Sequence, residues 1–382
     1  MPPDAATALR NDLLARLLEH CGWMCVTGEE GPIADAVERA QRDRGEPVDR
    51  IGHSLVVGGP PADGRPLVLL VGHLDVVAPT DADRLPRVEH DPVHGEIVVA
   101  RGTSDMKAGN VAAMAAFEDA ELRATSPYHL VLVLYAGEEG SADGNELRAV
   151  LAAAPWLTEA ALAIVLEPTD GEVQLGCLGS LHALVGFRGR QAHSARPWQG
   201  DNALTKAGGL LTDLHHDHVT DVEVEGIAYR DVWSATQAWT VGFGPGEGGN
   251  RFRNIVPDHF TVNLNLRFAP HRGLDAAEAE LRARVGDDVD VEVVDRAPPA
   301  PPRRHDPLVD AFVRSVDAPV TGKQAWTDVA RFAEVGVPAL NYGPGLTAQA
   351  HQRGEFVPID ALVDADRGLR RFLLARPAPE VR

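Results

Sequence analysis

Acidic and histidine side chains recur along the chain at the ends of apolar runs or in the loops just after them. They are His73, Asp75, Glu138, Glu139, Glu167 and His351. The apolar runs are typical of strands that are covered on both faces. Because the carboxyl ends of parallel strands meet at one edge of a sheet, we expect these side chains to lie together. Imidazole and carboxylate ligands in one place suit a divalent metal, zinc first, with cobalt or manganese as substitutes.

Asp105 adds a further carboxylate from a different context, the stretch ARGTSDMKAGN (100–110), which leads into a helix-forming run. Taken alone, Ser104 or Asp105 would simply cap that helix. Three carboxylates, on Asp105, Glu139 and Glu167, set against two dications would leave a charge of about +1, which a bridging hydroxide neutralises. A single dication would leave an excess of negative charge. The ligand count therefore favours two metals.

Each stretch also has an ordinary interpretation when it stands alone. His73 and Asp75 could be a solvated loop pair, and the adjacent glutamates 138–139 a surface charge pair. In a strand, however, residues i and i+2 share a face, so Asp75 can accept a proton from the far nitrogen of His73. The repetition of such residues at separate strand ends favours one common site over several unrelated ones.

The order of the expected elements predicts two domains, which is the default for 382 residues. Strands alternate with helices up to about residue 177, and one more strand of the same kind is expected at 337–345. Residues 1–177 and 296–382 are therefore predicted to form an α/β catalytic domain with a mixed, mostly parallel sheet covered by helices. Residues 178–295 read as β-α-β-β-α-β, a smaller ferredoxin-like α+β insertion. The Pro-rich stretch 297–302 is expected to be a stiff connector back to the first domain.

Composition limits the classes of partner. A net charge of −20 argues against nucleic acid, which requires clustered Lys and Arg. No apolar run approaches the roughly 20 residues of a membrane span, and the first residues lack the pattern of a signal peptide. The chain has three cysteines and no CxxC, so we expect no disulfide framework. These features predict a cytoplasmic protein that acts on a small molecule.

Five motifs in this order resemble the co-catalytic zinc deacylase/carboxypeptidase family, over nearly the whole chain. They are HLD (73–75), GTSDMKAG (102–109), GEEG (137–140), EPT (167–169) and GPG…AHQR…E (343–355). The resemblance implies two zinc ions, one on His73, Asp105 and Glu167, the other on Asp105, Glu139 and His351. It also implies that Asp105 bridges the ions, that the peptide after it is cis, that Glu138 is the general base and that Asp75 orients His73.

Longer stretches, including 175–204, 253–270 and 326–332, are similar to one branch of this family, the actinobacterial-type succinyl-diaminopimelate desuccinylases. That similarity implies a homodimer formed through the insertion, with His193 reaching the active site of the other subunit. It also implies substrate contacts, which it places at Asn254, Arg267, Thr327 and Arg331. The expected substrate is N-succinyl-LL-2,6-diaminopimelate, cleaved to succinate and LL-2,6-diaminopimelate.

One departure leaves other acyl groups open. Proteobacterial desuccinylases carry an Arg before a Gly-Ser in the first strand of the insertion, whereas residues 177–180 here are Cys-Leu-Gly-Ser and offer no cation. Acetylornithine or another N-acyl amino acid is the alternative substrate. The non-enzyme alternative, a metal-free binding module of the same fold, would need a metal ligand or Glu138 to be replaced, and none is.

Overall fold

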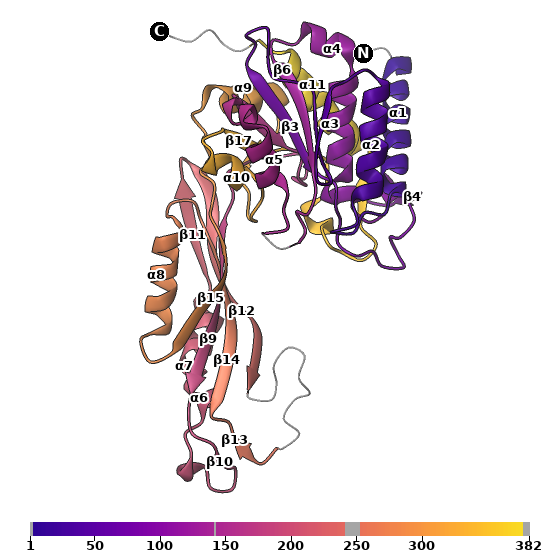
Figure 1. Ribbon diagram of the computed structural model, residues 1–382. Helices are drawn as coiled ribbons and strands as arrows, with labels where there is room; N and C mark the ends of the chain where they lie inside the picture. The colour runs from indigo at the N-terminus through magenta and orange to yellow at the C-terminus, as the bar shows by residue number, and fades with distance from the viewer. Residues whose placement is uncertain (1–2, 141–142, 241–252, 377–382) are drawn as a thin grey trace. The chain divides into compact units, whose positions relative to one another are not determined.

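The computed structural model describes residues 3–140, 143–240 and 253–376. The chain divides into two compact units, which are taken one at a time below (Figure 1). Unit 1 contains the residues up to Gly176, Arg303–Thr321 and the residues from Thr327 onward. Unit 2 contains Cys177–Pro302 and Gly322–Trp326, so the Pro-rich stretch 297–302 belongs to it.

Unit 1 is built on an eight-stranded mixed sheet. In spatial order its strands are β1 (Val48–Ile51), β2 (Ser54–Val57), β6 (His129–Tyr135), β3 (Leu67–His73), β7 (Leu162–Val165), β17 (Ala339–Asn341), β8 (Val173–Leu175) and β16 (Val320–Gly322). Strands β6, β3, β7 and β17 run parallel, and antiparallel pairs flank them on both sides. The predicted mixed α/β sheet is therefore confirmed, with its parallel part in the centre. Strand β17 pairs with β7 although the two lie far apart in sequence.

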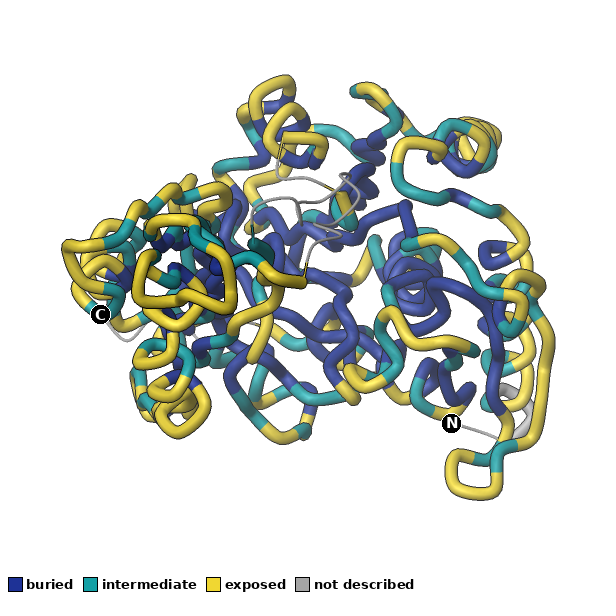
Figure 2. Tube along the Cα trace, turned by 90° about the horizontal axis from the view of Figure 1, so that it is seen from below, coloured by how far each residue is buried: buried dark blue, intermediate teal, exposed yellow. Residues whose placement is uncertain are grey.

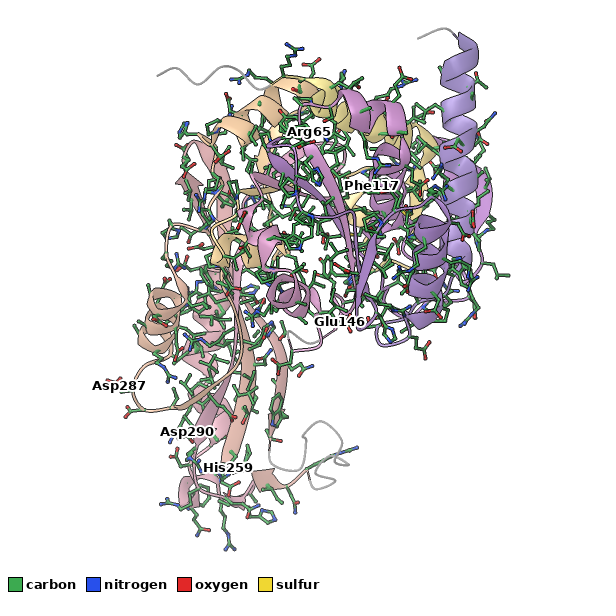
Figure 3. All side chains as sticks on the ribbon, turned by 45° about the horizontal axis from the view of Figure 1, so that its top comes forward. Arg65, Phe117, Glu146, His259, Asp287 and Asp290 are labelled. Carbon is green, nitrogen blue, oxygen red and sulfur yellow. The ribbon has the colours of Figure 1, made fainter. Side chains whose placement is uncertain are left out.

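The central parallel strands are buried because both faces of the sheet are covered. Every residue of β3 and β7 is buried, as their continuous apolar sequences predict. Figure 2 shows buried segments gathered in the interior of the trace, with exposed segments around them. The helices of unit 1 are α1 (Pro3–Gly22), α2 (Gly31–Asp43), α3 (Ala108–Glu118), α4 (Ala120–Thr125), α5 (Leu147–Ala153), α9 (Pro307–Val316), α10 (Val329–Glu334) and α11 (Ile359–Leu374). Helices α1, α3 and α11 share one apolar cluster that includes Leu13, Val111 and Leu362. Side chains fill the space between helices and sheet (Figure 3).

Unit 1 contains a small second sheet that the sequence analysis did not predict. It consists of β18 (Phe356–Pro358), β5 (Gly95–Val99) and β4 (Arg87–Asp91) in that order. Strand β4 is largely exposed, so it has no apolar pattern from which a strand could be predicted. The pairing of β18 with β5 is important for the site, because it brings Glu355 beside the loop that carries Asp105.

Unit 2 is a five-stranded antiparallel sheet with helices on one face. Its strands, in spatial order, are β11 (Val219–Val224), β12 (Ile227–Thr240), β14 (His259–Phe268), β9 (Gly179–Arg188) and β15 (Asp290–Ala297). Its helices are α6 (Ala203–Lys206), α7 (Gly208–His216) and α8 (Leu274–Val285). The order β12-β14-β9-β15 is the ferredoxin-like arrangement that the sequence predicted, and β11 is an additional edge strand.

Strand β14 shows why unit 2 folds this way. Val262, Leu264 and Leu266 belong to the apolar cluster of unit 2, while Asn263 and Asn265 alternate with them and point to the other face. A separate short pair, β10 (Ala192–His193) with β13 (Ile255–Val256), carries His193.

Among the helices in the described part of the chain, none is long and apolar enough to cross a membrane.

Candidate active site

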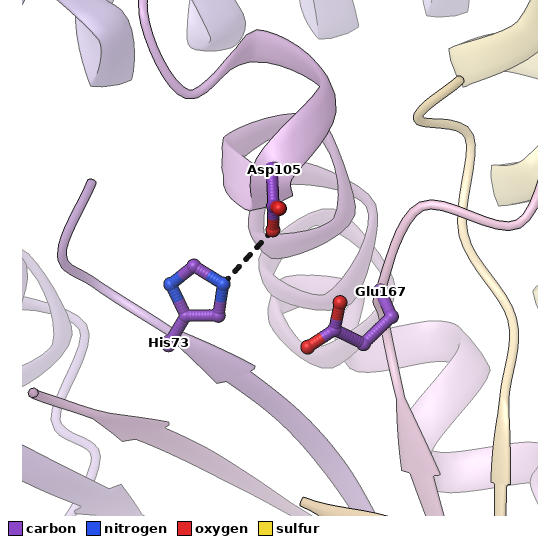
Figure 4. Close-up of side chains that lie close together, drawn as sticks. All are labelled: His73, Asp105 and Glu167. Atoms are coloured by element: carbon purple, nitrogen blue, oxygen red, sulfur yellow. Dashed lines mark hydrogen bonds and ion pairs between the residues drawn. The ribbon is translucent and has the colours of Figure 1, made fainter. Parts of the chain in front are cut away.

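Three of the predicted ligands meet where β3 and β7 end. His73 is the last residue of β3, and Glu167 lies just after β7 (Figure 4). Asp105 lies in the loop Thr103–Lys107 before α3, where its own backbone is not helical (φ −120°, ψ 95°). Nε2 of His73 lies 3.1 Å from Oδ1 of Asp105. One ligand atom from each of the three residues lies within 4.8 Å of the other two, which is close enough for one ion.

A second group of three ligands includes the same aspartate. Ligand atoms of Asp105, Glu139 and His351 also lie within 4.8 Å of one another. Nε2 of His351 is 2.8 Å from Oε2 of Glu139 and 3.7 Å from Oδ2 of Asp105. Asp105 thus presents Oδ1 to His73 and Oδ2 to His351. A further combination of His73 with Glu138 and Glu139 is also within reach, so the glutamate pair lies beside both groups.

The two glycines around Asp105 have different tasks. Gly102 has a φ of 82°, a left-handed conformation that side chains rarely adopt, and a Cβ there would lie 2.4 Å from Cγ1 of Val76. Gly109 is helical, but a Cβ on it would lie 2.1 Å from the carbonyl oxygen of Leu166. The first glycine therefore permits the turn before Asp105, and the second lets α3 approach the strand end beside Glu167. The peptide between Asp105 and Met106 is cis, as the family resemblance implied.

The HxD spacing predicted that Asp75 contacts His73, and in the structure its carboxylate also holds the loop of Glu138 and Glu139. Its carboxylate accepts hydrogen bonds from the backbone N–H groups of Glu138 (3.0 Å) and Glu139 (2.9 Å) and from the hydroxyl of Thr27 (2.9 Å). Nδ1 of His73 lies 3.0 Å from the backbone oxygen of Asp75 and 3.7 Å from its carboxylate. The backbone carbonyl is thus the nearer partner of the imidazole, and the carboxylate holds the glutamate loop.

Glu355 anchors the loop that carries Asp105. Its buried carboxylate accepts hydrogen bonds from the backbone N–H groups of Gly102 (2.9 Å), Ser104 (2.8 Å) and Asp105 (3.0 Å), and from Arg101 (2.9 Å). Burial raises the pKa of Glu355 to about 7, although the backbone N–H donors of Gly102 and Asp105 lower it. The sequence placed Glu355 inside the terminal motif but gave no reason to assign it a task, because its partners lie some 250 residues away in the chain.

The site concentrates negative charge. Burial raises the pKa of Glu138 well above its ordinary value, and the neighbouring Glu167 carboxylate raises it further, while His73 lowers it. The hydrogen bond to Glu139 raises the pKa of His351. For His73, burial lowers the pKa, but the hydrogen bond to Asp105 and the nearby carboxylates outweigh it, so the net shift is upward. Protons are held here because several carboxylates face one another, a situation that bound dications would relieve.

The remaining predicted residues fall into two sets. In unit 2, His193 and Asn254 are exposed neighbours, with Nδ2 of Asn254 3.4 Å from Nε2 of His193. Arg267 lies on β14, where its Nε donates to Asn265 (3.2 Å) and burial lowers its pKa. The structure thus brings two of these residues together within unit 2.

Thr327 and Arg331 lie in unit 1 and are almost completely buried. The hydroxyl of Thr327 donates to Asn341 of β17 (2.9 Å), and Nε of Arg331 donates to Asp328 (2.6 Å). Asp328 also accepts a hydrogen bond from the hydroxyl of Tyr135 at the end of β6 (2.6 Å). Both predicted substrate residues therefore make internal contacts that support the strand ends.

Comparison with known proteins places the chain in a family. The model of the Peptidase family M20/M25/M40 matches residues 69–375. A Mycobacterium tuberculosis protein, provisionally named a succinyl-diaminopimelate desuccinylase, is 37% identical over 90% of this chain and 93% of its own length. The succinyl-diaminopimelate desuccinylase of Corynebacterium glutamicum is 32% identical over 91% of this chain and 92% of its own.

Solved structures show the same fold. A tripeptidase from Staphylococcus aureus superposes with a TM-score of 0.75 at 16% identity, covering 96% of this chain and 98% of that one. Bacillus subtilis YXEP, described as a dinuclear metal-binding peptidase of the M20 family, gives a TM-score of 0.67 at 12% identity, with the same coverage of each chain. The family match and the two relatives define a metallohydrolase. The chain belongs to the peptidase family M20/M25/M40.

We expect Glu355→Gln to weaken both the fold and metal binding. A neutral amide offers one acceptor oxygen and turns an N–H group toward backbone donors, so the free energy of unfolding should fall by about 3 kcal/mol. Urea unfolding measures this loss, and competition with a chromophoric chelator measures metal affinity. Glu89→Gln, at an exposed residue that pairs with Arg87, is the matched control. Wild-type stability and metal affinity in Glu355→Gln would contradict the anchoring task.

Proposed function

We propose that the protein is a dizinc amide hydrolase that removes the acyl group from an N-acylated amino acid. The observation that carries the proposal is the position of Asp105, which belongs to two separate ligand groups. The donors fit the metal: imidazole nitrogens and carboxylate oxygens suit zinc, and cobalt or manganese can substitute. His73, Asp105 and Glu167 would hold one ion, and Asp105, Glu139 and His351 the other.

Two dications in these positions would polarise the amide carbonyl and lower the pKa of an attacking water to about 7. Side chains of the protein would then transfer the protons. In our proposal Glu138 accepts a proton from the water while the oxygen of that water forms a bond to the amide carbon. The same carboxyl group returns the proton to the amide nitrogen as the C–N bond breaks, releasing the acid and the amine. The position of Glu138 beside both ligand groups supports this assignment.

The proposed substrate is N-succinyl-LL-2,6-diaminopimelate. Support comes from the names of the two relatives that match along nearly their whole length. Asn254 and Arg267 are the proposed substrate contacts in unit 2, where the guanidinium of Arg267 offers a partner for a substrate carboxylate. A relative from Myxococcus xanthus, 32% identical over 85% of this chain and 83% of its own, is named acetylornithine deacetylase. N-acetylornithine is therefore the second candidate.

A panel of substrates decides between the two candidates. We expect the zinc-loaded protein to hydrolyse N-succinyl-LL-2,6-diaminopimelate with a kcat/KM at least about tenfold above that for N-acetylornithine, N-succinylornithine and N-acetyl-LL-2,6-diaminopimelate. The crossed compounds separate preference for the acyl group from preference for the amino acid. Turnover of acetylornithine without turnover of the succinyl compound would overturn the proposed substrate and keep the proposed chemistry.

The two adjacent glutamates should respond differently to the same substitution. Glu138→Gln deletes the proton acceptor but no proposed ligand, so we expect both metals to remain while kcat falls by about 10²–10⁴-fold. Glu139→Gln deletes a ligand and should lower zinc content. Elemental analysis of each variant after dialysis, together with kcat, measures both effects. If Glu138→Gln lost a zinc while Glu139→Gln kept two, the assignment would be reversed.

We further propose that the protein is a homodimer through unit 2 and that His193 acts across it. A neutral imidazole N–H could stabilise the oxyanion of the tetrahedral intermediate, so His193→Ala should lower kcat by about 10²–10³-fold and spare zinc content. Mixing inactive His193→Ala with inactive Glu138→Gln should restore activity, because one site of each mixed dimer would then hold both groups. Mixed dimers that stay inactive would refute action between subunits.

A further inference from the structure

Helices α1, α2 and α3 of unit 1 line a half-open cavity of about 190 Å³, and Glu19, Trp23 and Arg44 in its lining are exposed. The residues that line it include none of the proposed metal ligands. A cavity of this volume has room for several water molecules or for a molecule of the size of an amino acid. Helices α1 and α3 lie side by side (Figure 1), and Gln41 of α2 donates a hydrogen bond to Glu118 of α3.

Two buried polar atoms in the lining lack hydrogen-bond partners among the described residues. Gln41 is 1% exposed; its Nε2 donates to Glu118 (2.6 Å), but its Oε1 has no partner. His20 is 5% exposed and its Nε2 has no partner. Burial lowers the pKa of His20 to about 3, so its ring is neutral. Buried polar atoms normally have partners, and both of these belong to residues that line the cavity.

The charged residues of the lining balance one another. The carboxylate of Glu118 accepts hydrogen bonds from Arg16 (2.6 Å) and Gln41 and lies 3.0 Å from Arg44. Each guanidinium has five N–H groups, so both arginines retain donors beyond the contact with Glu118. Glu19 adds a carboxylate of its own to the lining. A ligand with one negative and one positive group would match this arrangement, whereas a simple anion or cation would meet a like charge.

We propose that this cavity binds a free α-amino acid with an aliphatic side chain of medium size. The carboxylate would bind the guanidinium groups of Arg16 and Arg44. The ammonium group would donate to Oε1 of Gln41, with Glu19 as its counter-charge. The aliphatic part would lie against the apolar members of the lining, Val37 and Met114. This inference does not depend on the proposed substrate.

The cavity lies close in structure to the loop of Asp105, which makes a selective probe necessary. Trp23 lines the cavity, and its backbone oxygen accepts a hydrogen bond from the buried ammonium of Lys107 (2.7 Å). An amino acid could also bind at the metal centre as a product would. The chain contains only four methionines, of which Met114 lines the cavity and Met106 contacts the backbone N–H of His73 through its sulfur.

Methyl NMR of the zinc-loaded full chain, labelled with ¹³C at the methionine methyl groups, distinguishes the two places. We expect L-leucine to shift the Met114 signal saturably, with a Kd between roughly 1 μM and 1 mM, and to leave Met106 unchanged. Met114→Leu and Met106→Leu assign the signals. Isoamylamine, which lacks the carboxylate, and 4-methylpentanoate, which lacks the amine, should each bind at least about tenfold more weakly.

Cavity variants complete the test. Ala40→Leu fills the space and Gln41→Leu removes the unpartnered oxygen, so each should abolish the Met114 shift; Ala279→Leu on the exposed face of α8 is the matched control. Leucine could also shift the Met106 signal by binding at the metal centre. In that case, the proposal is still supported if Ala40→Leu abolishes the shift of Met114 and leaves the shift of Met106. A Met114 signal that leucine does not move, or a shift that survives both cavity variants, would overturn the proposal.

Discussion

The crowding of carboxylates at the ends of three parallel strands is the constraint on which the rest of this structure depends. Asp105, Glu139 and Glu167 come from distant parts of the chain, yet each lies within ligand distance of an imidazole and of another carboxylate. Without cations such groups repel one another. Burial raises the pKa of Glu138, and the neighbouring carboxylates raise it further. Folding brings them together because the parallel strands β3 and β7, which are fully buried, end at the same edge of the sheet.

The loops that carry these residues are held by further carboxylates that face backbone N–H groups. Glu355 binds the turn before Asp105, and Asp75 binds the turn of Glu138 and Glu139. Both anchoring groups are buried, so each hydrogen bond is made where water cannot compete. Asp105 and Glu139, two of the candidate ligands, are therefore positioned by contacts to their backbone. A substitution in an anchor should alter the site without touching a candidate ligand.

The sequence predicted what depends on local pattern. Continuous apolar runs predicted β3, β6 and β7, and strict alternation predicted β14, so the mixed sheet and the ferredoxin-like arrangement were foreseen. Strand β4 was missed because an exposed strand buries nothing and shows no alternation. The edge strand β11 was missed although Val219–Val224 alternates in part, because it is mostly exposed.

The same distinction between local pattern and long-range contact applies to the residues of the site. The proximity of Asp105 to Glu167 and to His351 could be predicted because motifs and strand ends place these residues, while their role as ligands stays a prediction. The anchoring contacts of Glu355 could not, since they join residues that only β18 and β5 bring together. Thr327 and Arg331 were expected to contact substrate from their sequence context, which stays a prediction; their contacts with Asn341 and Asp328 come from the fold alone.

The central claim is that Asp105 is shared by two metal ions, and electron paramagnetic resonance tests it most directly. Manganese can replace zinc at such sites, and two manganese ions joined by one carboxylate are magnetically coupled. The account predicts an exchange-coupled spectrum when the metal-free protein is loaded with two equivalents of manganese, and the spectrum of isolated manganese in Asp105→Asn. A spectrum of two magnetically isolated ions in the unaltered protein would contradict the shared aspartate.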